Sequence, residues 1–257
     1  MSHEEGRYSV LGGAFPRETI VSIVLFFIAW ELLSLAAPWL GIPPFAVPSL
    51  FRIAQSFTKI TPIDVLVTLL RVLGALVVSF ILGVMIAIGM YLSGSLERYL
   101  RPLIRILKAV PVVSWILFAV LWFRGVEFRI LFVLVVVCAP VFVVDTLDSM
   151  RDVSRELRDM MRSFRPTSFQ FFRKLMLPAI LPGIFTSWKI ALSLAIRVVT
   201  IAELVGAVTG IGHQLSVAQE LFSVADVFAW TLVLVVLLFL LEGIIVRVEG
   251  RMLRWRT

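Results

Sequence analysis

The chain has 257 residues, of which 60% are hydrophobic and only 16% are charged, and its formal net charge is +7. A soluble domain of this length is nearer half apolar and a quarter charged, so the mean hydropathy of +1.01 argues against a soluble fold and for an integral membrane protein. Continuous apolar runs such as WTLVLVVLLFLLEGIIV disfavour the short alternating strands of a membrane barrel. We therefore expect an all-α membrane fold.

The predicted elements, in chain order, begin with a polar segment, residues 1–18, which is too acidic for a signal peptide and is expected to stay in the cytoplasm. Residues 19–257 are expected to form one transmembrane domain. Its apolar segments are long enough to cross a bilayer, and they lie at about 19–40, 65–92, 103–123, 127–147, 180–208 and 228–248. This pattern predicts about six spans in a multi-pass protein.

The positive charges fix the orientation of these spans. With the N-terminus inside, 17 Lys and Arg residues lie in cytoplasmic segments, four lie in outer loops and three lie within spans. Such a bias is typical of the cytoplasmic side of a membrane protein. We therefore place both termini in the cytoplasm and interpret the basic charge as a mark of topology and not of nucleic-acid binding.

The segment 148–179 is the longest cytoplasmic connection and carries an amphipathic pattern. Its apolar residues recur at helical spacing, and they are Val153, Leu157, Met160, Met161 and Phe164. Pro166 is expected to end this helix and to hold Arg165 extended. Thr167 and Gln170 form a capping-box pattern, which predicts a short second helix that ends at Leu177-Pro178.

Two roles fit such a basic helix-break-helix. It could lie on anionic lipid, as basic amphipathic helices often do. It could instead dock a cytoplasmic partner through exposed Met and Phe side chains.

The segment resembles the cytoplasmic EAA loop of binding-protein-dependent ABC-importer permeases of the type I class. Asp159-Met160-Met161 stands at the E-A-A place, Arg165 at the Gly place and Leu177-Pro178 at the end of the I-x-L-P place. The stretches LERYLRPLIRILKAVP and LPAILPGIFTSWKIALSLAIRVVTIAELVG are similar to the nitrate/sulfonate/taurine/bicarbonate branch. The chain departs from the pattern at Arg165 and by two bulky methionines where the pattern has alanines.

The resemblance implies the partners and the mechanism. Two permease copies would form the pathway in the bacterial inner (plasma) membrane, two ATPase subunits would dock the coupling loops, and an extracytoplasmic solute-binding protein would deliver the substrate. The implied ATPase contacts are Asp159, Met160, Met161, Phe164, Arg165, Pro166, Phe169, Leu177 and Pro178. ATPase closure would then switch the pathway between inward- and outward-facing states.

The residues offer no catalytic chemistry of their own. The chain has no G-x-x-x-x-G-K-[ST] phosphate loop, and its two histidines, His3 and His213, are far apart. We therefore expect no catalytic, cofactor or metal site in this chain, and we expect ATP and Mg²⁺ to be bound by the partner ATPase.

Ionisable residues within spans are costly in lipid and usually face protein or a water-filled path. Arg197 lies midway along the fifth predicted span and Glu203 lies near its outer end. They could form an ion pair within one copy or between copies, or Arg197 could attract an anionic substrate. By position alone, the pathway candidates are Arg197, Glu203, Thr200, Ser193 and Trp188.

The function expected from these features is that of a non-catalytic membrane permease for a small anionic solute. Importers of riboflavin, a pyrimidine precursor or an aromatic acid remain alternatives within the same family. An ATP-independent carrier or channel also explains six spans, but it gives no reason for a cytoplasmic helix-break-helix. A non-transporting scaffold leaves the charges within the spans unexplained.

Overall fold

The structure is a computed structural model that describes residues 17–43 and 45–254. These residues confirm the expected all-helical fold: five helices are long and apolar enough to cross a membrane, or six if one bent helix pair counts as a single span. Most of the expected cytoplasmic segment 1–18 lies outside the described residues.

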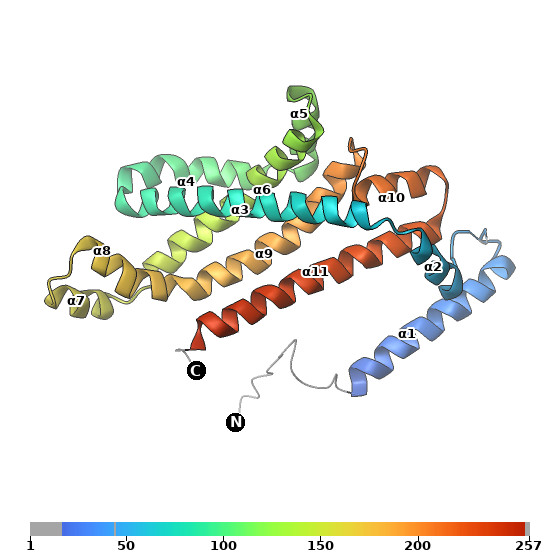
Figure 1. The fold of residues 1–257 in the computed structure, drawn as a ribbon, viewed down its shortest axis with the longest axis horizontal. Helices are drawn as coiled ribbons and strands as arrows, with labels where there is room; N and C mark the ends of the chain where they lie inside the picture. Colours follow the sequence, from blue (N-terminus) through green and yellow to red (C-terminus); the bar gives the residue numbers. More distant parts are fainter. Residues whose placement is uncertain (1–16, 44, 255–257) are drawn as a thin grey trace. The chain divides into compact units, whose positions relative to one another are not determined.

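The helices follow one another in a simple order (Figure 1). Their bounds are α1 Arg17–Ala36, η1 Ala37–Leu40, α2 Leu50–Ser56, η2 Phe57–Lys59, α3 Pro62–Leu92, α4 Gly94–Ala109, α5 Val112–Trp122, α6 Val126–Arg151, α7 Arg155–Ser163, α8 Ser168–Phe171, η3 Phe172–Met176, α9 Leu177–Leu204, α10 Ile211–Glu220 and α11 Val224–Met252. The described residues form two compact units, one up to Ile60 with Ala218–Thr231, and one of Thr61–Val217 with the residues from Leu232 on.

The smaller unit is held by polar contacts around the turn that follows α1. The Trp30 indole donates to the Pro48 carbonyl at 3.0 Å, and the Glu31 carboxylate accepts from the Leu50 amide at 2.9 Å. Lys59 pairs with Asp226 at 3.0 Å. The first two contacts satisfy backbone groups of this turn, and the third is an ion pair between two side chains.

The core of the larger unit lies where α6 packs between α3 and α9. Val72, Leu134, Phe142, Leu192 and Val199 are each no more than 1% exposed. At the ends nearest the 148–179 segment, the same helices pack through a second cluster, which contains Met150, Val153, Met176, Ile180 and Ile184. The three long helices therefore form the frame to which the 148–179 segment and the connections at the opposite end are attached.

The third predicted span, 103–123, is not one straight helix. Residues 94–109 form α4 and residues 112–122 form α5, and the two helices meet at 95°. Pro111 provides the physical reason, because it has no amide hydrogen to donate and disfavours helical geometry at Val110, which is extended with ψ 127°.

The predicted end of the short second helix at Leu177-Pro178 is wrong, because the helix continues from Ser168 to Leu204 as one run of 37 residues. Residues 172–176 form a wider π-helical turn, in which the Leu177 amide donates to the Phe172 carbonyl. Pro178 then lies in the first turn of α9, where a missing amide hydrogen is tolerated. The helix that contains the fifth predicted span therefore starts before residue 180 and ends at Leu204.

Candidate functional site

The 148–179 segment folds as two helical pieces separated by a sharp break. Ser154 caps α7 by accepting from the Leu157 amide at 3.2 Å. The capping box predicted at Thr167 and Gln170 is confirmed, with reciprocal hydrogen bonds of 3.2 and 3.0 Å. Both are N-terminal caps, so local bonds start α7 and α8 without help from the rest of the chain.

The break itself differs from the expectation in one respect. Arg165 is not extended: its φ of 48° places it in the left-handed region. A non-glycine residue there costs roughly 1–2 kcal/mol. The chain therefore makes the turn that a glycine would make most easily, and the prediction that Pro166 holds Arg165 extended is wrong.

The apolar side chains of this segment divide into two sets. Val153, Phe171, Leu175 and Met176 pack on the long helices, whereas those near the break are exposed. Met160 is 56% exposed, Phe164 75% and Phe169 68%. Of the predicted stripe, only Val153 is buried, at 6%. An isolated apolar face of this kind requires a covering surface from elsewhere.

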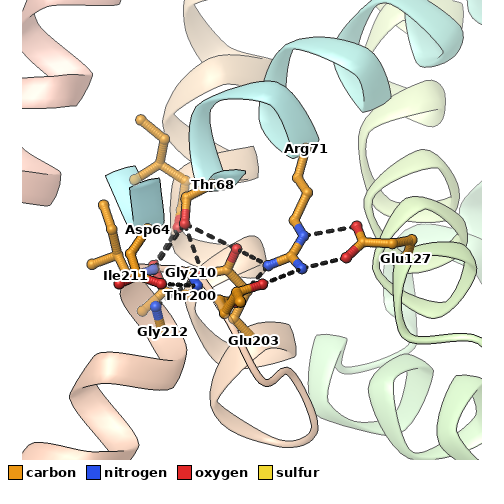
Figure 2. A network of polar contacts seen from close by, with 11 residues as sticks. Asp64, Thr68, Arg71, Glu127, Thr200, Glu203, Gly210, Ile211 and Gly212 are labelled. Atoms are coloured by element: carbon orange, nitrogen blue, oxygen red, sulfur yellow. Dashed lines mark hydrogen bonds and ion pairs between the residues drawn. The ribbon is translucent and has the colours of Figure 1, made fainter. Parts of the chain in front are cut away.

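At the other end of the larger unit, a buried carboxylate organises a polar network (Figure 2). Glu203 is fully buried and accepts from Arg71 at 2.8 Å, from Thr68 at 2.9 Å and from the Gly212 amide at 2.9 Å. Since a buried charge is costly unless it is paired and hydrogen-bonded, these donors from α3 and α10 account for the stability of Glu203 at this position.

Arg71 links this carboxylate to the next helix. Its guanidinium also donates to the Thr209 carbonyl at 2.8 Å and to both oxygens of Glu127 on α6, one of them at 2.9 Å. Figure 2 shows the guanidinium between the two glutamates. The side chain of Arg71 is 6% exposed, whereas that of Glu127 is 70% exposed. The network thus runs from the core to the surface of the unit.

The connection from α9 to α10 fits tightly over Glu203. Asp64 accepts from the Gly210 amide at 2.8 Å and from Gln214 at 2.9 Å. Gly210 has a φ of 111°, and a Cβ there would lie 2.6 Å from the Glu203 carboxylate. A Cβ on Gly212 would lie 2.4 Å from the Thr200 carbonyl oxygen. Glycine is therefore required at both positions by space, and at Gly210 also by conformation.

The predicted pathway residues divide into separate groups. Glu203 and Thr200 both lie against Gly212. Trp188 instead packs against Phe80 and Phe142, with ring centroids 5.4 and 5.5 Å away. Ser193 and Arg197 lie one turn apart on α9, on the side from which the Thr200 side chain also projects. Arg197 is exposed there, whereas Ser193 and Thr200 are half-buried.

The expected ion pair between Arg197 and Glu203 within one chain is wrong. The two residues are six positions apart, so their side chains point about 120° apart around the helix and are separated by more than one turn along it. Glu203 pairs with Arg71 instead. Among the described residues no ion pair or hydrogen bond to the Arg197 side chain is found.

The sequence alone did not identify Asp64, Thr68 or Glu127 as site residues, and it did not indicate which residue pairs with Arg71. Arg71 within a span was a usable signal, because an ionisable group in lipid requires a partner. The glycines of TGIGH were a second signal, since they indicated a tight turn. Neither signal identifies the partner, because the contacts join residues more than 130 positions apart.

The sequence of this chain is similar to those of known membrane-transport proteins. Residues 79–254 match the family described as "Binding-protein-dependent transport system inner membrane component". The putative aliphatic sulfonates transport permease protein SsuC of Bacillus subtilis is 29% identical over 177 residues, which are 68% of this chain and 64% of that protein, slightly under two thirds. The formylaminopyrimidine transport permease protein ThiX of Halalkalibacterium halodurans is 25% identical over 93% of this chain and 96% of its own length.

A solved structure shows a similar fold. The MetNI methionine ABC transporter, in an inward-facing conformation, matches with a TM-score of 0.63 at 19% identity. The match covers 72% of this chain and 92% of the MetNI chain.

Proposed function

Because the chain belongs to the family of binding-protein-dependent transport system inner membrane components, we propose that it is the permease of an ABC importer that carries a small anionic solute. The family makes it the non-catalytic, multi-pass inner-membrane subunit of such an importer, which works with an ATPase and a binding protein. The proposal adds the charge of the solute, the pathway residues and the way in which the partners dock.

Arg197 is the observation that carries the proposed charge of the solute. Of the three cations within the predicted spans, Arg71 is paired with two glutamates, and Lys189 pairs with Glu249 at 2.6 Å. Among the described residues, the Arg197 side chain has no ion pair and no hydrogen bond, although an unpaired charge within a span is costly. A water-filled pathway that attracts anions would provide the missing reason for this charge.

The surroundings of Arg197 support a pathway position. Exposed or half-exposed residues recur every three or four positions along α9, and they are Thr186, Ile190, Ser193, Arg197, Ile201 and Leu204. This stripe carries two hydroxyl groups and one cation among apolar side chains. We propose that it faces the corresponding stripe of a second permease copy across the pathway, with Thr200 at its edge and the buried Glu203 behind it.

The relatives agree with this solute class in part. The Bacillus relative is named for aliphatic sulfonates, which are anions, whereas the Halalkalibacterium relative is named for formylaminopyrimidine. Because the second relative aligns with 93% of this chain, a pyrimidine precursor is the second candidate. The anion is preferred because a neutral heterocycle leaves the unpaired Arg197 unexplained.

For coupling, we propose that the exposed face of the 148–179 segment docks one ATPase subunit, with the termini and this segment in the cytoplasm. Met160, Phe164 and Phe169 supply apolar anchors of the kind that dominate protein interfaces. In a dimer of the permease, two ATPase subunits would each hold one such segment. Closure of the ATPase pair would then move the two segments together and reorient the spans.

Uptake by proteoliposomes that contain the permease and its ATPase tests the proposed solute charge. A thermal-shift screen of the solute-binding protein with nitrate, taurine, a sulfonate, bicarbonate and a formylaminopyrimidine first selects the probe. Arg197→Leu should then lower ATP-driven uptake about tenfold or more, which corresponds to about 1.4 kcal/mol, a part of the Coulomb energy of two charges near a protein surface. Arg197→Lys keeps the charge and should retain most of the uptake.

Ile190→Ala, on the same stripe, is the matched control that removes only apolar surface. The anion proposal would be overturned if the screen selects a neutral solute and Arg197→Leu takes up that solute as fast as the wild type does. Loss of permease assembly in Arg197→Leu would assign the residue to the contact between copies instead of the pathway.

A further inference from the structure

A cavity of about 570 Å³ lies between the 148–179 segment and the inner ends of the membrane helices. Its walls come from α3, α6, α7, α8 and η3 together with the break at residues 165–166. The apolar part of the lining consists of Ile88, Leu92, Met150, Phe171, Phe172 and Met176. The volume is within the range of small-molecule and cofactor sites.

Two cations also belong to this lining, beside Tyr91, Pro166 and Ser168. Arg162 and Arg165 both border the cavity. Arg162 pairs with the Asp159 carboxylate at 3.8 Å, and both side chains are more than 70% exposed. An ion pair this exposed contributes little free energy. Among the described residues, no ion pair is found for Arg165. The cavity thus combines an apolar interior with two cations that lack a firm anionic partner.

The position of the cavity relative to the membrane narrows the choice of ligand. Leu92 is the last residue of α3, and Met150 lies one residue before the end of α6. The distribution of Lys and Arg places these ends at the cytoplasmic surface of the bilayer. Acidic phospholipids of this leaflet present phosphate at that depth, next to acyl chains.

The backbone at Arg165 is a second, independent observation. Its φ of 48° is strained for any residue with a side chain, and glycine would make the same turn without this cost. Strained residues of this kind are found where a ligand clamp requires a particular side-chain position. Here the strained turn places a cation on the edge of an apolar cavity.

We propose that this cavity binds an anionic amphiphile of the inner leaflet, with its acyl chain among the apolar residues and its acidic head on Arg162 and Arg165. The chemistry required is one anionic head on an apolar chain, which an acidic phospholipid or a free fatty acid can supply. Phe164 and Phe169 are exposed and do not line the cavity. An ATPase on that outer surface and an amphiphile in the cavity can therefore be bound at the same time.

Native mass spectrometry of the detergent-solubilised permease tests this site without requiring transport. The protein is equilibrated with mixed micelles of phosphatidylglycerol and phosphatidylcholine, and separately with oleate. A cation close to an acidic surface contributes roughly a fivefold preference for the anionic lipid, so the double variant Arg162→Gln, Arg165→Gln should bind phosphatidylglycerol roughly thirtyfold more weakly. Arg173→Gln, an exposed cation of the same segment that does not line the cavity, is the control and should bind it like the wild type.

Three other results have a defined meaning. Equal retention of phosphatidylglycerol by the wild type and the double variant would overturn the proposal. Selective binding of oleate alone would support the site with a fatty acid as its ligand. Displacement of the bound lipid when the ATPase subunit is added would overturn it, because the cavity would then belong to the ATPase interface.

The site can also be separated from general effects of the membrane. Met176→Trp would fill part of the cavity from η3, where Met176 is 3% exposed. This variant should lower lipid retention while both arginines remain. Unchanged retention in Met176→Trp would show that the lipid lies on the arginines outside the cavity, and this result too would contradict the proposal.

Discussion

The Glu203 network and the 148–179 segment of this permease differ in which side chains they bury and which they expose. Around Glu203, the two central charges, Glu203 and Arg71, are buried and are paired with each other across elements far apart in the sequence. In the 148–179 segment, apolar groups are exposed, and the hydrogen bonds join residues three or four positions apart. The first region finds its partners within one chain, whereas the second presents a surface that none of the described residues covers.

The difference teaches which part holds the fold and which part meets a partner. Removal of one member of a buried ion pair leaves a charge without compensation. Removal of an exposed phenyl ring changes the stability of the isolated chain little, but the same ring can contribute about 1.5–3 kcal/mol when another protein buries it. Substitutions in the two regions should therefore affect different measurements.

The largest expected effect on the fold is that of Glu203→Ala. It leaves Arg71 with Glu127 as its one carboxylate partner among the described residues. It also removes the acceptor of Thr68 and of the Gly212 amide, so a destabilisation of about 3–5 kcal/mol is expected. Thermal unfolding in detergent, followed by size-exclusion chromatography, measures this loss. Glu220→Ala, at the exposed end of α10, is the control and should unfold like the wild type. Equal unfolding temperatures for both variants would remove the structural role assigned to the network.

A smaller effect is expected for Gly210→Ala. The added methyl group would lie 2.6 Å from the Glu203 carboxylate at a φ of 111°, which should destabilise the permease by about 1–3 kcal/mol. Gly74→Ala has open space around it and should stabilise α3 by roughly 0.5–1 kcal/mol. The same unfolding assay compares the two. A destabilisation by Gly74→Ala as large as that by Gly210→Ala would show that the packing over Glu203 is not the cause.

The smallest effect tests the strained turn in the 148–179 segment. Arg165→Gly should stabilise the isolated permease by about 0.5–1 kcal/mol, because relief of the left-handed strain exceeds the entropy cost of glycine. Arg165→Ala keeps the strain and removes the charge, so it should give no such gain. Both are measured in neutral detergent by thermal unfolding. Equal gains from the two variants would assign the effect to charge repulsion and not to the backbone.

Local features of both regions could be predicted from the sequence to a large extent. The apolar runs predicted an all-helical membrane fold, and the Thr167–Gln170 pattern predicted the capping box, since such signals depend on neighbouring residues. The sign of φ at Arg165 could not be predicted, because both extended and left-handed geometries are compatible with the residue before a proline. The continuation through Pro178 depends on a π-helical turn that has no sequence signature.

The partner of Glu203 shows where the limit lies. Because an ionisable residue within a span requires a partner, the sequence implied that Glu203 pairs with a cation. Arg197 is closer to Glu203 in sequence than Arg71 is, and it was therefore the candidate. The helix geometry excludes it, and Arg71 reaches Glu203 only because α3 packs beside α9. Such a pairing requires the tertiary arrangement, which no local pattern contains.

The central claim, that the exposed face of the 148–179 segment transmits ATPase closure to the spans, is tested most directly by the double variant Phe164→Ala, Phe169→Ala. Its permease should unfold like the wild type, and in proteoliposomes with the ATPase it should bind the ATPase about thirtyfold or more weakly, since two interface aromatics are worth about 2 kcal/mol or more. ATP-driven, vanadate-sensitive uptake should fall in parallel. Normal ATPase binding together with normal uptake by this variant would contradict the account.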